Sequence, residues 1–128
     1  MKEIEKYYDN TELDFPHSNV KKFVEMKIKP GNAIELGCGA GRDTIYLIKN
    51  NWNVIAIDRE DVEQRISKRL NNEEKNRFKF EQQNFEELRI NKINLIVANY
   101  SLPFCNKNKF DELWNKIENN ILPNRIFC

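Results

Sequence analysis

Three alternating glycines, Gly37, Gly39 and Gly41, follow a short apolar run and constrain the fold more than any other part of the chain. The run at residues 33–37 has the length and composition of a strand, and residues 44–49 then show the spacing of an amphipathic helix. Glycine is needed where the backbone turns sharply or comes close to a ligand without a Cβ in the way. The segment therefore predicts a strand, a tight turn and a helix.

Apolar runs and helical patterns alternate along the rest of the chain. We expect strands at residues 33–37, 54–58, 78–82 and 93–98. Helical spacing predicts helices before residue 30, at 44–49, around 60–70 and at 110–121. This order predicts an α/β fold, namely a Rossmann-like, doubly wound and mostly parallel sheet with helices on both faces.

Finer patterns place some of these elements. Residues 54–58 are β-branched and suit a strand buried on both faces, whereas residues 78–82 alternate around Lys79 as an edge strand does. Residues 93–98 are mostly apolar and predict a central strand. Asn50 and Asn51 can take the left-handed conformation that closes a helix.

Both ends of the chain also carry patterns. A loop from Tyr7 through Phe15-Pro16 is expected to lead into a helix that Pro30-Gly31 ends. The apolar side of this helix is predicted from Val20, Phe23, Val24 and Met26. One face of the last helix is predicted from Phe110, Leu113, Trp114, Ile117 and Ile121.

Asp58 closes the second predicted strand, 21 residues after Gly37. A carboxylate at this place can accept hydrogen bonds from both hydroxyls of a ribose. A dinucleotide-binding turn would place its third glycine at position 42, but that residue is Arg42. The spacing therefore disfavours a pyrophosphate-binding turn, and a nicotinamide-dependent oxidoreductase is the weakest of the functions considered.

The segment from Glu35 to Asp43, Glu-Leu-Gly-Cys-Gly-Ala-Gly-Arg-Asp, resembles the first motif of class I S-adenosylmethionine-dependent methyltransferases. The Arg-Asp pair and the later Asn99-Tyr100-Ser-Leu-Pro-Phe segment look most like the tellurite-resistance and thiopurine-like small-molecule group, over residues 7–128. The resemblance implies seven strands in the order 3-2-1-4-5-7-6 and S-adenosylmethionine as cofactor. In that family the acidic residue at position 35 helps to organise the methionyl end.

The resemblance also implies a role for residues after the third and fourth strands. Asn84-Phe85 matches the place where the family recognises adenine, with an amide in place of the usual acid. Asn99 and Tyr100 match the substrate-facing motif, although the sequence is not the N-P-P-[YF] box of amide and adenine methyltransferases. The cofactor-binding residues expected on this basis are Glu35, Gly37, Cys38, Gly39, Gly41, Arg42, Asp58, Arg59, Asn84, Phe85, Asn99 and Tyr100.

Several of these residues have simpler interpretations. Phe85 can be a core anchor, Asn99 and Tyr100 can end a strand, and position 38 requires only a small residue. His17, the single histidine, is either a base near the site or a residue at a helix start. Tyr7 and Tyr8 lie in an N-terminal segment that either covers the cofactor or packs on the core.

Composition sets the broad class. The 128 residues suit one domain, with residues 1–29 as an N-terminal helix or lid and 30–128 as the core through the start of a fifth strand. The net charge of +1, from 21 basic and 20 acidic residues, does not predict a nucleic-acid partner. No apolar stretch predicts a membrane span, and three scattered cysteines with one histidine argue against a metal site. We expect a cytoplasmic protein.

Methyl transfer from a sulfonium is an in-line displacement that needs alignment more than a dedicated nucleophile, so no catalytic residue is assigned. The chain is expected to end where the fifth strand begins, and an uncovered sheet edge there favours association between copies. Two hypotheses remain beside the oxidoreductase: an active methyltransferase for a small-molecule acceptor, and a truncated remnant that binds the cofactor without activity.

Overall fold

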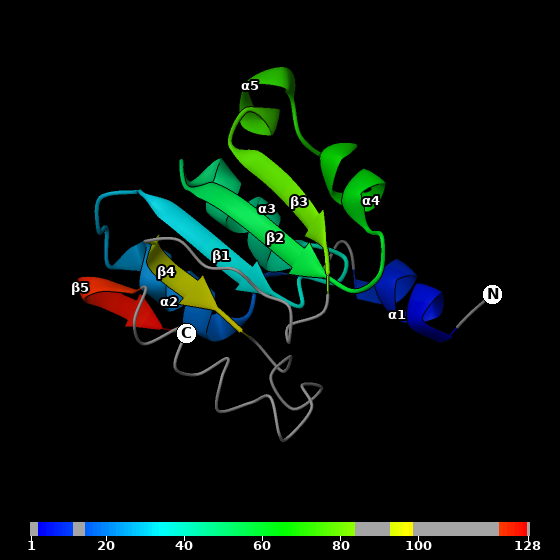
Figure 1. Cartoon of the computed structure of the whole chain (residues 1–128), viewed down its shortest axis with the longest axis horizontal. Helices are drawn as coiled ribbons and strands as arrows, with labels where there is room; N and C mark the ends of the chain where they lie inside the picture. Colours follow the sequence, from blue (N-terminus) through cyan, green and yellow to red (C-terminus); the bar gives the residue numbers. More distant parts are fainter. Residues whose placement is uncertain (1–2, 12–14, 84–92, 99–120, 128) are drawn as a thin grey trace.

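A computed structural model describes residues 3–11, 15–83, 93–98 and 121–127. Its centre is a five-stranded sheet in the order β3-β2-β1-β4-β5, and all four neighbouring pairs are parallel (Figure 1). The strands are β1 Asn32–Leu36, β2 Asn53–Asp58, β3 Phe78–Gln82, β4 Ile93–Val97 and β5 Ile121–Phe127. The first four confirm the predicted strands to within one residue at each end, with β3 at an edge and β4 in the interior.

The fifth strand differs from the sequence prediction. β5 is seven residues long and pairs with β4, whereas the sequence led us to expect only its start and to assign Ile121 to a helix. Ile121 lies four residues after Ile117, which fits a helical period, but the parallel pairing to β4 decides its conformation. The register shifts along this pair, and Pro123 lies in the shifted stretch, where a strand tolerates proline. The side of β4 that was expected to lie uncovered is therefore paired with β5.

The N-terminal region also differs from its prediction. Residues Glu3–Thr11 form helix α1 where we expected a loop from Tyr7, and the i, i+4 spacing of Ile4 and Tyr8 accounts for it. Helix α2 spans Ser18–Glu25 and ends five residues before Pro30, because Lys27 already has a left-handed φ of 56°. Met26 therefore lies beyond the apolar side and is 61% exposed, so its assignment to that side was wrong.

The helices that connect the strands lie mostly where the sequence places them. Helix α3, Arg42–Lys49, follows the glycine turn and is closed by Asn51 with a φ of 73°. The single helix expected around residues 60–70 is instead a short α4, Glu63–Ser67, followed by α5, Asn72–Lys75. Asn71 separates them, because its side chain accepts from the backbone N–H of Glu74 in a capping box that starts α5.

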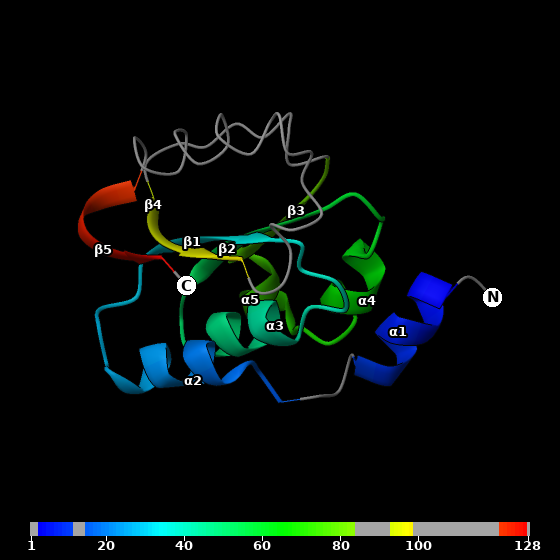
Figure 2. The ribbon, with the colours of Figure 1, turned by 90° about the horizontal axis from the view of Figure 1, so that it is seen from below.

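Helices α2 to α5 lie on one face of the sheet (Figure 2). Apolar residues of three strands point toward these helices, and Val20, Phe23, Leu47 and Ile66 fill the space between. The strand residues on this face are Ala33, Val54, Ala56, Leu95 and Val97. Ile34, Leu36, Ile57 and Ile96 of the other face are also buried, as predicted for a central parallel sheet, and the helices expected on that face lie outside the described residues. The expected helix at 110–121 lies, up to residue 120, outside the described residues.

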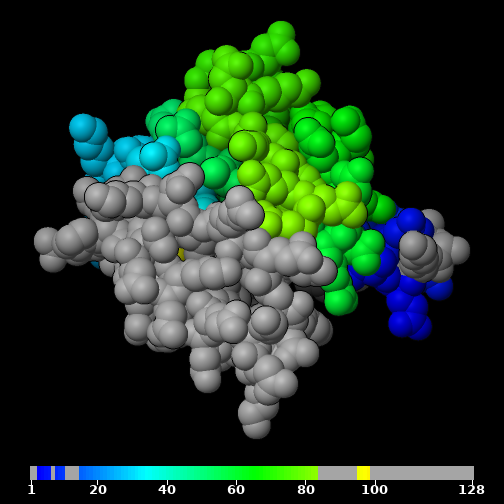
Figure 3. All heavy atoms as spheres, viewed as in Figure 1, coloured from blue at the N-terminus to red at the C-terminus, as the bar shows by residue number. Residues whose placement is uncertain are grey.

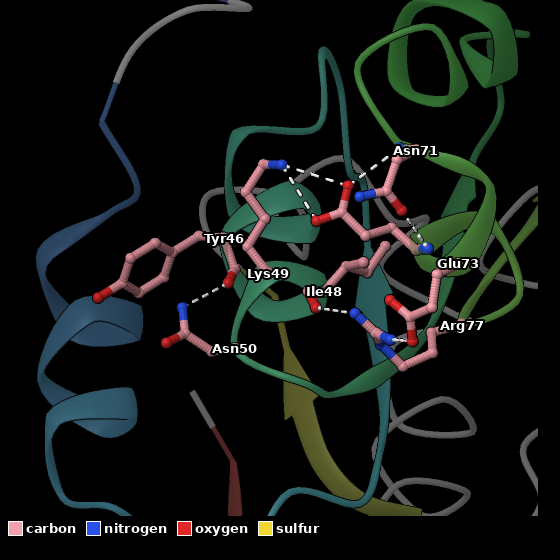
Figure 4. Close-up of polar contacts among 8 residues, drawn as sticks. Tyr46, Ile48, Lys49, Asn50, Asn71, Glu73 and Arg77 are labelled. Atoms are coloured by element: carbon pink, nitrogen blue, oxygen red, sulfur yellow. Dashed lines mark hydrogen bonds and ion pairs between the residues drawn. The ribbon is translucent and has the colours of Figure 1, made fainter.

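A polar cluster fastens the end of α3 to α5 (Figure 4). Lys49 of α3 pairs with the Glu74 carboxylate at 3.1 Å, and Glu74 also accepts from the backbone N–H of Asn71 at 3.0 Å. Arg77 donates from Nη2 to the carbonyl of Ile48 at 2.8 Å and pairs through Nη1 with Glu73. The carbonyl of Ile48 at the helix end thus gains a charged donor.

The cluster predicts acid sensitivity. The hydrogen bonds from Asn71 and Lys49 lower the pKa of Glu74, so its carboxylate stabilises the fold above its unfolded pKa. This contribution is lost as the pH falls through the folded pKa. The difference in thermal midpoint between the wild type and Glu74→Gln should therefore shrink between about pH 7 and about pH 3.

The matched control is Glu73→Gln, on the same helix, because the Glu73 side chain is 71% exposed. It should lower the midpoint little at either pH. A gap between the wild type and Glu74→Gln that stays constant across this range would contradict the role given to the Glu74 carboxylate.

Candidate functional site

The glycine turn, residues 37–41, is shaped by the unusual backbone conformation of its three glycines. Gly37, Gly39 and Gly41 have φ values of 71°, 54° and 88°, which side chains rarely adopt. The N–H groups of Gly37 and Cys38 donate to the carbonyl of Ile57 at 2.8 and 3.2 Å, which fixes the turn to the end of β2. Gly41 N donates back to the Cys38 carbonyl at 2.9 Å before α3 begins. The chain thus reverses within five residues at the carboxyl edge of the sheet.

Asp58 lies beside this turn at the end of β2 and is 8% exposed. Its Oδ2 accepts from the N–H of Gly39 at 2.9 Å, and its Oδ1 accepts from the N–H of Glu60 at 2.9 Å. The structure therefore brings together the two features that the sequence singled out, the glycines and the acid 21 residues later. Each carboxylate oxygen has two lone-pair directions, so these two bonds do not exhaust what Asp58 can accept.

Glu35 lies on β1 and points toward α3, where the hydroxyl of Thr44 donates to its Oε2. The carboxyl is 4% exposed. Burial raises the pKa of Glu35 well above its ordinary value, the nearby Asp43 carboxylate raises it further, and the hydrogen bond from Thr44 acts in the opposite direction. A cation arriving beside Glu35 would therefore favour its ionised form.

The remaining expected residues on described parts of the chain differ in position. Cys38 is buried within the turn, and burial raises the pKa of its thiol, which disfavours the reactive thiolate. Arg42 is the first residue of α3 and adjoins the turn. Arg59 is exposed just beyond Asp58, and its carbonyl accepts from Gln82 Nε2 at 3.0 Å. Asn84, Phe85, Asn99 and Tyr100 lie outside the described residues.

The sheet order places these residues at a topological switch point. The chain proceeds from β1 outward to β2 and β3, and then β4 pairs on the opposite side of β1. In open α/β sheets, ligands bind beyond the carboxyl ends of the strands that flank such a point. Here these are the ends of β1 and β4, and the glycine turn follows β1 directly.

Sequence reasoning did not assign Asp43 to the site, and it left His17 and Tyr8 undecided. Asp43, at 1% exposed, accepts from the backbone N–H of His17 at 2.8 Å and contacts the His17 ring at Nδ1 at 2.6 Å. Tyr8 of α1 lies over the turn, with its ring 3.5 Å from where a Cβ of Gly39 would be. The contacts of His17 with Asp43 and of Tyr8 with Gly39 join residues 26 or more positions apart, so no local sequence pattern predicts them.

Helix α1 is fastened in place from the side of α4. Arg65 lies over the Tyr8 ring at 5.5 Å from its centroid and pairs with Asp9 at 2.7 Å. Burial, and then the charges of Asp58 and Glu60, raise the pKa of Tyr8, so its hydroxyl stays neutral. Figure 3 shows α1 in blue against the green residues of the α4 region. The Tyr8 ring thus shields the middle of the glycine turn.

The turn predicts a large difference between two glycine substitutions. A Cβ on Gly41 would lie 2.8 Å from Cδ1 of Ile66 and closer still to Cγ1, with a φ of 88° in addition. We expect Gly41→Ala to cost about 3 kcal/mol of unfolding free energy, from overpacking and backbone strain together. A Cβ on Gly39 has only ordinary contact with Tyr8, so Gly39→Ala should cost about 1 kcal/mol.

Chemical denaturation of both variants measures these costs. Gly39→Ala is the matched control, because it also has a positive φ but lacks the clash. Equal costs at the two positions would show that the contact with Ile66 does not hold the turn.

Comparison with known proteins adds to this geometry. The model of the family described as tellurite resistance protein TehB matches residues 1–124. No curated protein sequence matches the chain. Among the solved structures that match is the glycopeptide N-methyltransferase MtfA complexed with S-adenosylmethionine, with a TM-score of 0.72 and 18% identity over 90% of this chain and 54% of that one.

Two further structures have the same fold. TehB from Haemophilus influenzae has a TM-score of 0.72 and 18% identity, over 97% of this chain and 44% of that one. A Burkholderia thailandensis N1-methyltransferase, solved with 1,6-didemethyltoxoflavin and S-adenosylhomocysteine, has a TM-score of 0.70 and 18% identity, over 86% of this chain and 49% of that one. The chain thus spans about half the length of these structures.

The likeness to the solved structures confirms the fold predicted from the sequence, and the family match confirms the resemblance to the tellurite-resistance group. Within the described residues, no helix is both long enough and apolar enough to cross a membrane. The chain belongs to the TehB tellurite resistance protein family and has the fold of S-adenosylmethionine-dependent methyltransferases.

Proposed function

We propose that the chain binds S-adenosylmethionine at the glycine turn and serves methyl transfer to a small-molecule acceptor. The observation that carries this proposal is the hydrogen bond of 2.9 Å from Gly39 N to Asp58, with Glu35 buried on the neighbouring strand. It joins a turn that admits a ligand along its backbone to a carboxylate suited to ribose hydroxyls. Family membership supports the same function.

The donor and acceptor groups fit the two ends of this cofactor. Asp58 can accept from ribose hydroxyls while it keeps its bonds to Gly39 and Glu60. Glu35 would hold the ammonium group of the methionyl end, because a cation there offsets the cost of its burial. Asn84 and Phe85 would recognise adenine, and Asn99 and Tyr100 would face the cofactor or the acceptor.

Bound S-adenosylmethionine would supply a methyl group on a sulfonium. The acceptor would take this methyl group directly, without a metal or a nucleophilic residue of the protein. The residues of this chain would align the donor and keep water away from it. Tyr8 supports the second role, because its ring covers Gly39 and is held there by Arg65. The N-terminal segment, residues 1–29, would then serve as a cover for the cofactor.

Calorimetric titration tests the cofactor assignment. We expect S-adenosylmethionine to bind and NAD not to bind, and Asp58→Ala to weaken the affinity for S-adenosylmethionine about tenfold or more, as expected for lost charge-assisted hydrogen bonds. Asp61→Ala is the matched control, because Asp61 is exposed in the segment after β2. Binding of NAD without S-adenosylmethionine would replace this proposal with the oxidoreductase.

Asp58→Asn separates ribose recognition from support of the turn. An amide oxygen can still accept from the N–H of Gly39, while the amide nitrogen gives up the bond from the N–H of Glu60, so the turn should keep its bond to residue 58 while the affinity falls. An affinity unchanged in both Asp58 variants would remove Asp58 from the ligand site.

A second candidate is a protein that binds the cofactor without turnover, and the observation that favours it is that the described contacts, Gly39 with Asp58 and Thr44 with Glu35, concern the cofactor and not an acceptor. Labelled-methyl transfer to a panel of thiols, tellurite and amines distinguishes the two. We expect labelled product from at least one acceptor. Binding of S-adenosylmethionine without product from any acceptor would favour the binding protein.

A further inference from the structure

His17 lies between two charged residues at the start of α3. Its backbone N–H and its ring Nδ1 both contact the Asp43 carboxylate, at 2.8 and 2.6 Å. On the other side of the ring, Nη2 of Arg42 lies against Nε2. His17 is also the residue that precedes helix α2, so the three residues connect the N-terminal region to the first turn of α3.

The chemistry of the neighbours determines the tautomer of the His17 ring. A guanidinium can only donate, so Nε2 must accept and carries no proton. The proton is therefore on Nδ1 and is donated to Oδ2 of Asp43. In this tautomer, Asp43 orients the ring and the ring holds one edge of the Arg42 guanidinium.

Three buried carboxyl groups near the glycine turn make its surroundings acidic. Glu35, Asp43 and Asp58 are all buried there, at 4%, 1% and 8% exposed, so the surroundings are rich in carboxylates. The methionyl end of the proposed ligand carries a carboxylate as well as an ammonium group. Without a cation beside it, that carboxylate would be repelled.

Arg42 is the cation that suits this place. The ammonium and carboxylate groups of an amino acid share one carbon, so their partners must be neighbours. Arg42 begins α3, and Thr44 of the same helical turn donates its hydroxyl to Glu35, so the first turn of this helix carries Arg42 beside the Glu35 site. A guanidinium also matches the planar geometry of a carboxylate better than any other side chain.

We propose that His17 is a positioning residue that aims Arg42 at the carboxylate of bound S-adenosylmethionine, and that Asp43 in turn holds His17. This inference rests on the proposed function. An arginine side chain has several rotatable bonds, and a partner that holds one edge of the guanidinium removes part of the entropy cost of binding. His17 thereby contributes to affinity without touching the ligand.

Two substitutions separate the two sides of the ring. Asparagine places an amide nitrogen near the position of Nδ1 and keeps the donor to Asp43, but it offers nothing to Arg42. Glutamine can place its amide oxygen near the position of Nε2 and keeps an acceptor for Arg42. We expect His17→Asn, like His17→Ala and Arg42→Met, to weaken S-adenosylmethionine binding about tenfold or more. His17→Gln should stay within about threefold of the wild type.

The ligand is varied in parallel. Decarboxylated S-adenosylmethionine keeps the ammonium, the sulfonium and the adenosine and lacks only the carboxylate. In calorimetric titrations, His17→Asn and Arg42→Met should bind it as tightly as the wild type does, which also shows that the variants are folded. Asp58→Ala should weaken both ligands equally, because the ribose is common to them.

The outcomes distinguish this inference from the proposed function. Equal losses for both ligands in His17→Asn would reduce His17 to a structural role, and so would rescue by asparagine instead of glutamine. Either result overturns the inference while the cofactor assignment stands. A wild-type protein that binds neither ligand would refute the proposed function and this inference with it.

Discussion

The hydrogen bonds from the glycine turn to the end of β2 are the constraint on which the site depends. Gly37 and Cys38 donate to the carbonyl of Ile57, and Gly39 donates to the Asp58 side chain. Parallel pairing brings the ends of β1 and β2 together, and these bonds extend the contact beyond the ladder. The backbone of the turn is therefore held by the neighbouring strand, and its N–H groups are paired there.

Three buried carboxyl groups surround that turn, and each is stabilised differently. Glu35 has a raised pKa and a hydroxyl donor from Thr44, Asp43 accepts twice from His17, and Asp58 accepts two backbone N–H groups. Burying carboxylates costs free energy unless they are hydrogen-bonded or paired. Each of the three has such a partner, and Glu35 and Asp58 are also the carboxyl groups proposed to receive the ligand.

The sequence predicted the parts of this structure that depend on local pattern. Strand composition located β1 to β4, and the glycine spacing with Asp58 predicted that the turn and the acid would meet, because parallel neighbours end at one edge. The break between α4 and α5 has a local signal in the sequence, the capping box from Asn71 to Glu74. Ile121 was wrongly assigned to a helix, because its spacing from Ile117 fits a helix although the residue begins β5.

Contacts between distant segments could not be predicted in the same way. The pairing of His17 with Asp43 and the position of Tyr8 over Gly39 depend on how the N-terminal helices pack on the finished sheet. A single histidine before a serine is common at helix starts, and an aspartate in a first helical turn is expected for the helix dipole alone. Only the three-dimensional packing shows that these two residues bind each other.

The polar cluster behind α3 has a consequence for the opposite end of that helix. Helix α3 has eight residues and is about 12 Å long, with Arg42 at its first position and Lys49 at its last. Such a short helix moves as one rigid unit. Lys49 pairs with Glu74, and the Ile48 carbonyl accepts from Arg77, so these contacts limit how far the helix can tilt or shift. If these contacts were lost, α3 could shift and the orientation of Arg42 at its other end would be less well defined. Glu74 and Arg77 would then influence ligand binding without touching the ligand.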